Sequence, residues 1–137
     1  MKHRTKKIGL TTLFAMLMLG SQLPKTDKAE PLPSKRQTRL GKASWYSRKS
    51  PGINRHTANR EVFDDAALTC AMWNVHFNQK VRVTNKETGK SIIVRVNDRG
   101  PHQRLVNKGR IIDLTQRAFS ELSPTKHGLI SVEIELL

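Results

Sequence analysis

The stretch that decides the fold begins with Lys80-Val81-Arg82-Val83-Thr84-Asn85 and ends with Ser91-Ile92-Ile93-Val94-Arg95-Val96. The first segment alternates apolar and polar residues, which is the period of a half-buried strand. The second is rich in β-branched residues, which favour strands. Glu87-Thr88-Gly89-Lys90 between them has the composition of a turn. The stretch therefore predicts an antiparallel β-hairpin.

The residues after this hairpin predict one short helix and a last strand. Thr115 is a suitable N-cap for a helix that carries Ala118, Phe119 and Leu122 on one face. The segment 129–135 alternates again, from Leu129 to Glu135, which predicts a strand.

The residues before the hairpin predict a strand over 43–47 and a short helix within 63–72, where Asp64 and Asp65 suit a helix N-terminus. Many short strands, little helix and no strand–helix–strand rhythm indicate a mainly β protein, a small barrel with one or two short helices.

The 137 residues of the chain are enough for one modest domain.

The chain begins with features of an export signal. Four basic residues precede an apolar run over 8–20, which has the size of a signal-peptide core and is too short for a comfortable membrane span. An uncleaved anchor helix is the alternative. Ser21 stands where a lipid-bearing cysteine would be needed, so we expect residues 1–20 to be a signal peptide without lipidation.

The expected organisation is this leader, a basic proline-containing linker over 21–40, and one domain over 41–137. We expect an exported protein, in the periplasm or outside the cell and soluble rather than lipid-anchored. A membrane would be contacted only through an uncleaved leader, and a monomer is expected.

The chain is strongly basic, with a net charge of +14, and such a field attracts polyanions. Charge alone would suggest nucleic acid, but the export signal argues against it and favours anionic wall or envelope polymers. Cys70 is the single cysteine, so an intramolecular disulfide is excluded, and its apolar neighbours favour a buried thiol over a nucleophile. The histidines do not have metal-ligand spacing, and no metal or cofactor is expected.

Six ordered segments resemble the rare lipoprotein A (RlpA)-like domain over about residues 41 to 135. They are Gly41-Lys42-Ala43-Ser44-Trp45-Tyr46, Thr57-Ala58-Asn59-Arg60-Glu61-Val62-Phe63-Asp64, Leu68-Thr69, Val81-Arg82-Val83-Thr84-Asn85, Asn97-Asp98-Arg99-Gly100-Pro101 and Gly109-Arg110-Ile111-Ile112-Asp113-Leu114.

The resemblance implies a six-stranded double-psi β-barrel, the fold of expansins and some lytic transglycosylases, and a peptidoglycan glycan strand as ligand. Enzymes of the family cleave between N-acetylmuramic acid and N-acetylglucosamine without water and leave a 1,6-anhydro sugar. One carboxyl group can serve as acid and then as base, because the attacking hydroxyl belongs to the substrate. Ordinary glycosidases instead use two carboxyl groups.

The resemblance places the catalytic role on acidic residues. Asp98 is the first candidate for the general acid/base, and its alternative is a turn aspartate that accepts backbone hydrogen bonds. Glu61 and Asp64 match an acidic pair of the family and are further catalytic candidates; without the family they would be a surface acid and a helix-start residue.

The remaining candidates would bind substrate. Asp113 matches an aspartate of the expansin-like site or anchors the helix at Thr115. Arg99 could hold a sugar or carboxylate, or form an outward salt bridge. Trp45 and Tyr46 could stack on a sugar ring, but in an alternating strand only one can easily face a groove.

The sequence departs from the family at three positions. Met72 replaces a histidine that could titrate near neutral pH, and a thioether cannot transfer protons. His76 lies four residues on and is a further substrate-binding candidate. It could substitute for the lost histidine only if a helix ran through Met72; otherwise it is a half-exposed structural histidine. Arg60 replaces a glycine.

Two hypotheses follow, with a third from another class. The four acids together favour a lytic transglycosylase. Loss of the histidine suggests instead a non-catalytic, expansin-like wall-binding module. A secreted inhibitor that uses the barrel to bind protein is the third.

Overall fold

The computed structural model describes Gly20 and residues 36–137, so the expected signal peptide and most of the expected linker lie outside the described residues. Every element belongs to the unit that spans residues 33–137. In chain order the elements are β1 (Thr38–Tyr46), β2 (Thr69–Ala71), β3 (Lys80–Asn85), β4 (Ser91–Asp98), α1 (Gln103–Val106), β5 (Arg110–Thr115), α2 (Gln116–Leu122), η1 (Thr125–His127) and β6 (Leu129–Leu136).

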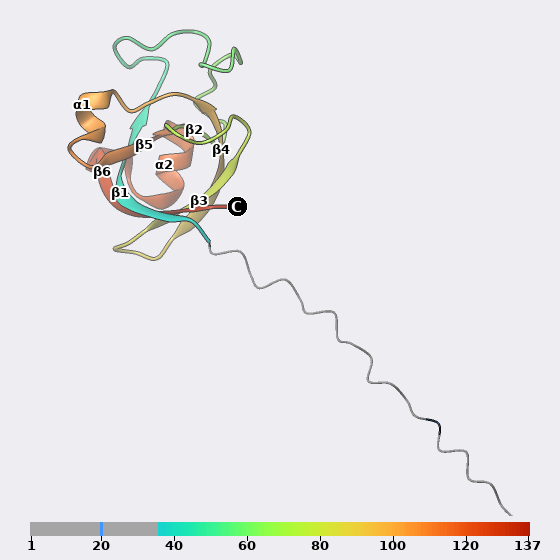
Figure 1. Ribbon diagram of the computed structural model, residues 1–137. Helices are drawn as coiled ribbons and strands as arrows, with labels where there is room; N and C mark the ends of the chain where they lie inside the picture. The colour runs from blue at the N-terminus through green and yellow to red at the C-terminus, as the bar shows by residue number, and fades with distance from the viewer. Residues whose placement is uncertain (1–19, 21–35) are drawn as a thin grey trace, which may run out of the picture. The chain divides into compact units, whose positions relative to one another are not determined.

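The six strands form a closed barrel in the order β1-β5-β2-β4-β3-β6 (Figure 1). The pairs β1–β5 and β2–β4 are parallel, and the four other pairs are antiparallel. Closure removes the free edges that an open sheet would expose. The expectation of a six-stranded barrel with short helices is confirmed.

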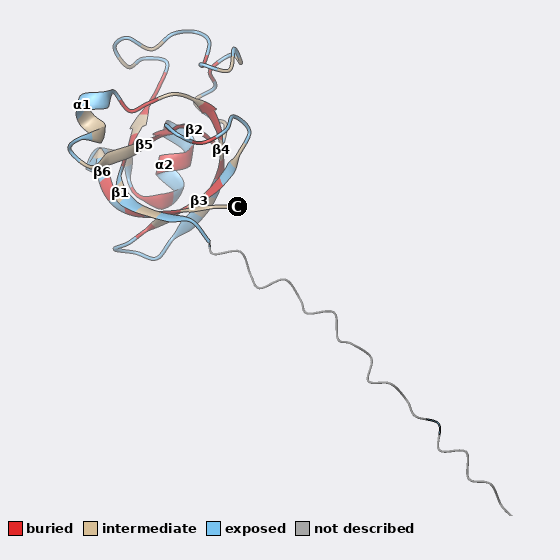
Figure 2. Ribbon diagram, viewed as in Figure 1, coloured by how far each residue is buried: buried red, intermediate tan, exposed pale blue. Residues whose placement is uncertain are grey.

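Alternating residues of the strands fill the barrel. Val81 and Val83 of β3 and Val94 and Val96 of β4 are at most 1% exposed. The apolar face of α2, formed by Ala118, Phe119 and Leu122, belongs to the same core, and Figure 2 colours this part of the helix as buried. Burial of these side chains provides most of the driving force for folding.

The predicted hairpin, helix and last strand are confirmed. β3 and β4 pair with Val83 opposite Ile92, and the turn is closed by Asn85, whose N–H donates to the Lys90 carbonyl at 2.8 Å. The Thr115 hydroxyl accepts from the Ala118 N–H at 3.2 Å, which is an N-cap bond.

Two expected elements are wrong in extent or type. β1 begins at Thr38 rather than Ala43, because residues 38–42 pair with β6 at the end of the domain. The short helix expected within 63–72 is absent: this segment contains turns and then β2. The Asp64 carboxylate accepts from the Ala66 N–H at 2.9 Å, so it closes a turn of its own loop instead of starting a helix.

Among the described residues, no helix has the length and apolar character needed to cross a bilayer.

Candidate active site

Three strands bring two carboxyl groups to either side of Ala71. In the ladder, Ala71 of β2 pairs with Asp98 of β4 on one side and with Asp113 of β5 on the other. Cross-strand neighbours point to the same face of a sheet. The backbones that carry the two aspartates are therefore two strand spacings apart, roughly 10 Å.

A register shift in β4 sets the position of Asp98. Cys70 pairs with Val96 and the next residue, Ala71, pairs with Asp98, so Asn97 is an extra residue in the ladder. Such bulges re-aim side chains and are common beside active sites.

Gly100 closes the space behind Asp98 and has a φ of +156°, a conformation that side chains rarely permit. A Cβ at this position would lie 3.3 Å from the Ala71 Cβ and 3.6 Å from Asp113 Oδ2. The turn that follows Asp98 therefore packs closely against Ala71 of β2 and Asp113 of β5. This close approach explains why glycine occupies position 100.

The Asp98 carboxylate is held by three donors. The N–H groups of Ala58 and Arg99 donate to Oδ1 at 2.9 and 2.8 Å, and the Tyr46 hydroxyl donates to Oδ2 at 3.2 Å. Burial, followed by the charge of Asp98, raises the pKa of Tyr46, so the phenol keeps its proton and remains a donor. The three bonds fix one orientation of the carboxylate.

Asp113 is buried and paired with a neighbouring guanidinium. Its side chain is on the same strand as Arg110, whose Nε and Nη2 both lie 2.6 Å from Asp113 Oδ1. Burial raises the pKa of Asp113; Arg110 acts in the opposite direction, and the negative charge of Asp98 raises this pKa further. Asp113 therefore retains a proton to a higher pH than an ordinary aspartate does.

Glu61 anchors the loop that carries Ala58. Its carboxylate forms a bidentate pair with Arg95 at 2.6 and 2.9 Å and also accepts from the Asn59 and Asn97 amides. The Arg95 hydrogen bonds lower the pKa of Glu61 to about 2. Glu61 is thus an ionised clamp between the loop and β4 rather than a free acid.

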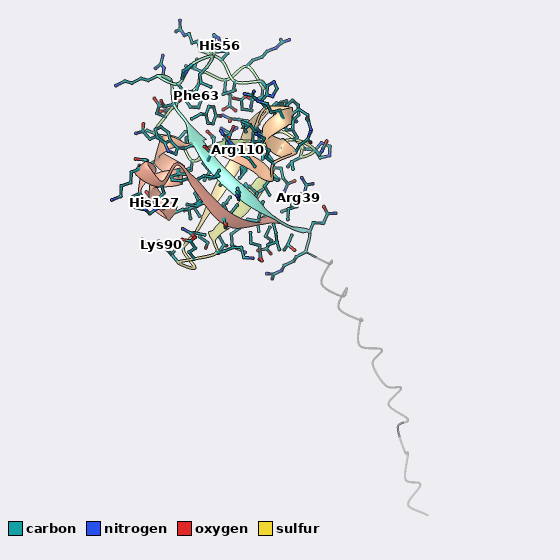
Figure 3. The ribbon with its side chains drawn as sticks, turned by 90° about the vertical axis from the view of Figure 1, so that its left-hand side faces the viewer. Arg39, His56, Phe63, Lys90, Arg110 and His127 are labelled. Atoms are coloured by element: carbon teal, nitrogen blue, oxygen red, sulfur yellow. The ribbon has the colours of Figure 1, made fainter. Side chains whose placement is uncertain are left out.

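A cleft of about 320 Å³ opens over Asp98 and Arg99. Its other lining residues belong to the loop between β1 and β2: Gly52, Ile53, Asn54, His56, Thr57 and Ala58. Figure 3 shows His56 and Phe63 at the end of the barrel opposite Lys90, so the cleft lies away from the β3–β4 turn. The cleft is the place where a ligand can reach Asp98.

The cleft contains a histidine that the sequence interpretation did not select. His56 precedes the Thr57-Ala58 segment that matches the family pattern, and this proximity was the available signal. An imidazole in this cleft can donate or accept a hydrogen bond beside Asp98.

The expected histidine, His76, lies in a second hollow of about 360 Å³ that Trp73, Asn74, Val75 and Arg99 also line. Arg99 borders both spaces, because it is also one of the residues that line the Asp98 cleft. Its Nη1 donates to the Met72 carbonyl at 2.9 Å, and its guanidinium carbon lies 3.8 Å from the Phe77 ring centroid. Arg99 is therefore fixed inward rather than in a salt bridge.

The structure separates Trp45 from Tyr46. Tyr46 contacts Asp98 and stacks on Phe63, with ring centroids 4.7 Å apart. Trp45 points to the opposite side, where its Nε1 donates to the Thr125 carbonyl at 3.0 Å and its ring lines another hollow. Tyr46 is buried and contacts Asp98 from beneath, outside the lining of the cleft, so stacking of either aromatic ring on a sugar stays a prediction.

Neither the Asp64 side chain nor the Met72 side chain forms a hydrogen bond with the Asp98 carboxylate. Asp64 is exposed on its own turn. The Met72 side chain is 1% exposed and belongs to the barrel core together with Cys70, while Ala71 between them faces the site. Burial raises the pKa of the Cys70 thiol, so Cys70 is the inert buried thiol expected from the sequence.

Within residues 36–137 and Gly20, no group of three histidine, cysteine, aspartate or glutamate side chains has the geometry to hold a metal ion.

Comparisons with known proteins identify the family of the chain. A family model described as lytic transglycolase matches residues 38–134. The chain is 41% identical over 100 residues to a protein named endolytic peptidoglycan transglycosylase RlpA from Vibrio cholerae, which covers 73% of this chain and 36% of that protein. It is 39% identical over 109 residues to the protein of the same name from Rickettsia felis, covering 79% of this chain and 46% of that protein. The chain thus spans less than half the length of these relatives.

Two solved structures share the fold. The Streptomyces papain inhibitor superposes with a TM-score of 0.57 at 23% identity, covering 74% of this chain and 94% of that chain. An expansin from Clavibacter michiganensis gives a TM-score of 0.54 at 20% identity, covering 74% of this chain and 50% of that chain. These matches confirm the expected double-psi β-barrel.

Proposed function

Since the chain belongs to the lytic transglycolase family, we propose that its barrel binds peptidoglycan glycan strands and cleaves them between N-acetylmuramic acid and N-acetylglucosamine. The products carry 1,6-anhydro-N-acetylmuramic ends. The observation that carries this proposal is the Asp98 carboxylate, held by three donors in an open cleft beside the buried Asp113.

In the proposed reaction Asp98 acts twice. Its protonated carboxyl donates a proton to the glycosidic oxygen as the bond to muramic C1 breaks, and the departing sugar leaves with a hydroxyl. The resulting carboxylate then accepts the proton of the muramic C6 hydroxyl as O6 bonds to C1. Proton and charge return to the starting state, so no water or cofactor is consumed.

Asp113 lies beside Asp98 in this scheme. Burial and the nearby charge of Asp98 raise the pKa of Asp113, so Asp113 adds less negative charge next to Asp98 than an ordinary aspartate would. Tyr46 and Ala58 supply donors that hold Asp98 once it is ionised. Glu61 keeps the Ala58 loop on β4 and is a positioning residue in this scheme.

The test is incubation of the full chain with purified sacculi, followed by mass spectrometry for 1,6-anhydro ends. We expect Asp98→Asn to reduce product formation by at least about 100-fold, the usual contribution of general acid–base catalysis, with pelleting on sacculi retained. Glu87→Gln, an exposed change in the β3–β4 turn, is the matched control and should leave the rate unchanged.

Asp64→Asn is measured in parallel, because Asp64 is the other acid that the resemblance marks and it is exposed to solvent. Full activity of Asp98→Asn together with loss of activity in Asp64→Asn would move the catalytic role to Asp64. Activity in both variants would contradict catalysis by either Asp98 or Asp64.

A non-catalytic wall-binding module is the second candidate, and Met72 favours it. A buried thioether stands where the family has a histidine, so this position supplies no titratable group. Sacculi that bind the wild-type chain but yield no anhydro ends would establish this function instead.

We also propose that the protein works outside the cytoplasm, as a soluble protein and a monomer. The basic and apolar residues of 1–20 and the location of peptidoglycan support this placement. Anionic wall or envelope polymers are proposed as further partners on the basis of the net charge of +14, of which +10 remains without the four basic residues of the expected leader.

A further inference from the structure

We propose that the hollow lined by Trp73, Asn74, Val75, His76 and Arg99 is a saccharide subsite that receives the pyranose ring next to the one at Asp98. The inference rests on the proposed glycan-binding function and deepens it. The cleft at Asp98 and this hollow share Arg99 as a wall, so a chain of linked sugars can continue from one to the other.

Trp73 supplies the platform. Its side chain is 39% exposed, although a large aromatic residue is normally buried in a small domain. Its Nε1 donates to the Pro101 carbonyl at 2.6 Å, which fixes the plane of the indole and leaves ring surface open to solvent. A fixed aromatic face with a satisfied N–H suits the apolar face of a sugar ring.

The segment that carries Trp73 is held rigidly from several sides. Arg39 donates to the carbonyls of Trp73 and Asn74 at 3.4 and 3.3 Å, and Arg99 donates to the Met72 carbonyl. Asn78 donates its N–H to the Val96 carbonyl at 2.8 Å and ties the end of the segment to β4. A ligand therefore does not have to order this loop on binding, which favours affinity.

The polar rim of the hollow matches a sugar rather than an apolar partner. Asn74 and His76 are exposed at its edge and can form hydrogen bonds with hydroxyl and acetamido groups, while Arg99 contributes a cation beside Phe77. An apolar wall with a few placed polar groups is the usual composition of a small-molecule site. Met72 and His76, two of the positions at which the sequence departs from the family pattern, lie in this segment.

The test uses amidase-released glycan oligomers of alternating N-acetylglucosamine and N-acetylmuramic acid, titrated by calorimetry into the full chain. All proteins carry Asp98→Asn, so that the oligomer is not cleaved. Trp73→Leu removes the aromatic face and should weaken binding about tenfold. Trp73→Phe keeps a ring but loses the bond to Pro101, and it should stay within about threefold of the parent.

Ile93→Ala is the matched control, because Ile93 is also an exposed apolar residue, on β4 and outside both hollows. Equal affinity of the parent and Trp73→Leu would overturn the subsite while leaving the proposed function intact. Equal weakening by Trp73→Phe and Trp73→Leu would assign the effect to the lost Pro101 bond and would also overturn it. Absence of binding by the parent would instead refute glycan binding itself, and the subsite with it.

Discussion

At the scale of single residues, the structure explains why Arg60 is an unusual choice. Its φ is +72°, in the left-handed region where a Cβ crowds the backbone. The family has glycine at this position, which adopts that conformation without steric cost. Asn78, with φ +68°, lies in the same region, and asparagine is among the side chains that tolerate it best.

We predict that Arg60→Gly stabilises the protein by up to about 1 kcal/mol, because the relief of strain exceeds the extra entropy of glycine in the unfolded chain. Arg60→Ala keeps the Cβ and should give no such gain. The measurement is the urea midpoint of each variant, and a glycine variant no more stable than wild type would contradict the assignment of strain.

At the scale of elements, the loop between β1 and β2 is fixed onto β4 by Glu61. The Glu61–Arg95 pair bridges loop and strand, and Asn59 donates its N–H to the Asn97 carbonyl at 3.2 Å. Phe63 packs beneath with Tyr46 and Ala71 in a small cluster of its own. The loop therefore brings Ala58 to Asp98 as part of a structured unit.

This clamp predicts a defined pH dependence. The pKa of Glu61 is lowered from 4.5 to about 2, so its stabilising effect is complete above about pH 4.5 and is lost as the pH falls toward 2. Glu61→Gln should unfold at lower urea concentration than wild type at pH 7, and the difference should shrink across that acidic interval. A difference that stayed constant down to pH 2 would show that ionisation of Glu61 is not its cause.

The sequence predicted those elements whose residues carry a clear period. Val81 and Val83 alternate with polar residues over six positions, and Thr115 precedes an apolar face, so the hairpin and helix could be foreseen. β2 has only three residues, all buried, which is too short for a period to appear. Asp64 before this strand resembled a helix start, because turns and helix N-termini favour the same side chains.

The candidate site was predictable only in part, for a similar reason. Asp98 was identified from its turn and from the family pattern. Its closeness to Asp113 depends on β2 lying between β4 and β5, and such pairing of distant strands leaves no local mark in the sequence. The roles of Glu61 and Arg95 as a closed ion pair, and of Trp73 as an exposed ring, likewise depend on partners far along the chain.

At the scale of the whole molecule, the basic charge acts on any polyanionic partner. The net charge is +14 on 137 residues and +10 without the basic residues of the expected leader, and such a charge attracts anionic polymers over distances that salt controls. The Debye length falls from about 30 Å at 0.01 M salt to about 3 Å at 1 M.

We therefore predict that pelleting of the chain with sacculi that retain anionic polymers weakens strongly between these two salt concentrations. Binding through aromatic stacking and neutral hydrogen bonds should change little between the same two salt concentrations, because salt does not screen these interactions. Equal salt dependence on sacculi with and without their anionic polymers would contradict a role for these polymers.

The pairing of β1 with β6 has a further consequence for how the chain reaches its structure. Thr38 pairs with Glu135 at the far end of the domain, so the barrel closes only when its first and last strands meet. Contacts between such distant residues make folding slow, because the entropy of a long loop is lost before the contact is gained. On a ribosome, the ring would stay open until β6 had emerged, and a nascent chain halted before Leu129 should remain sensitive to protease along its whole length.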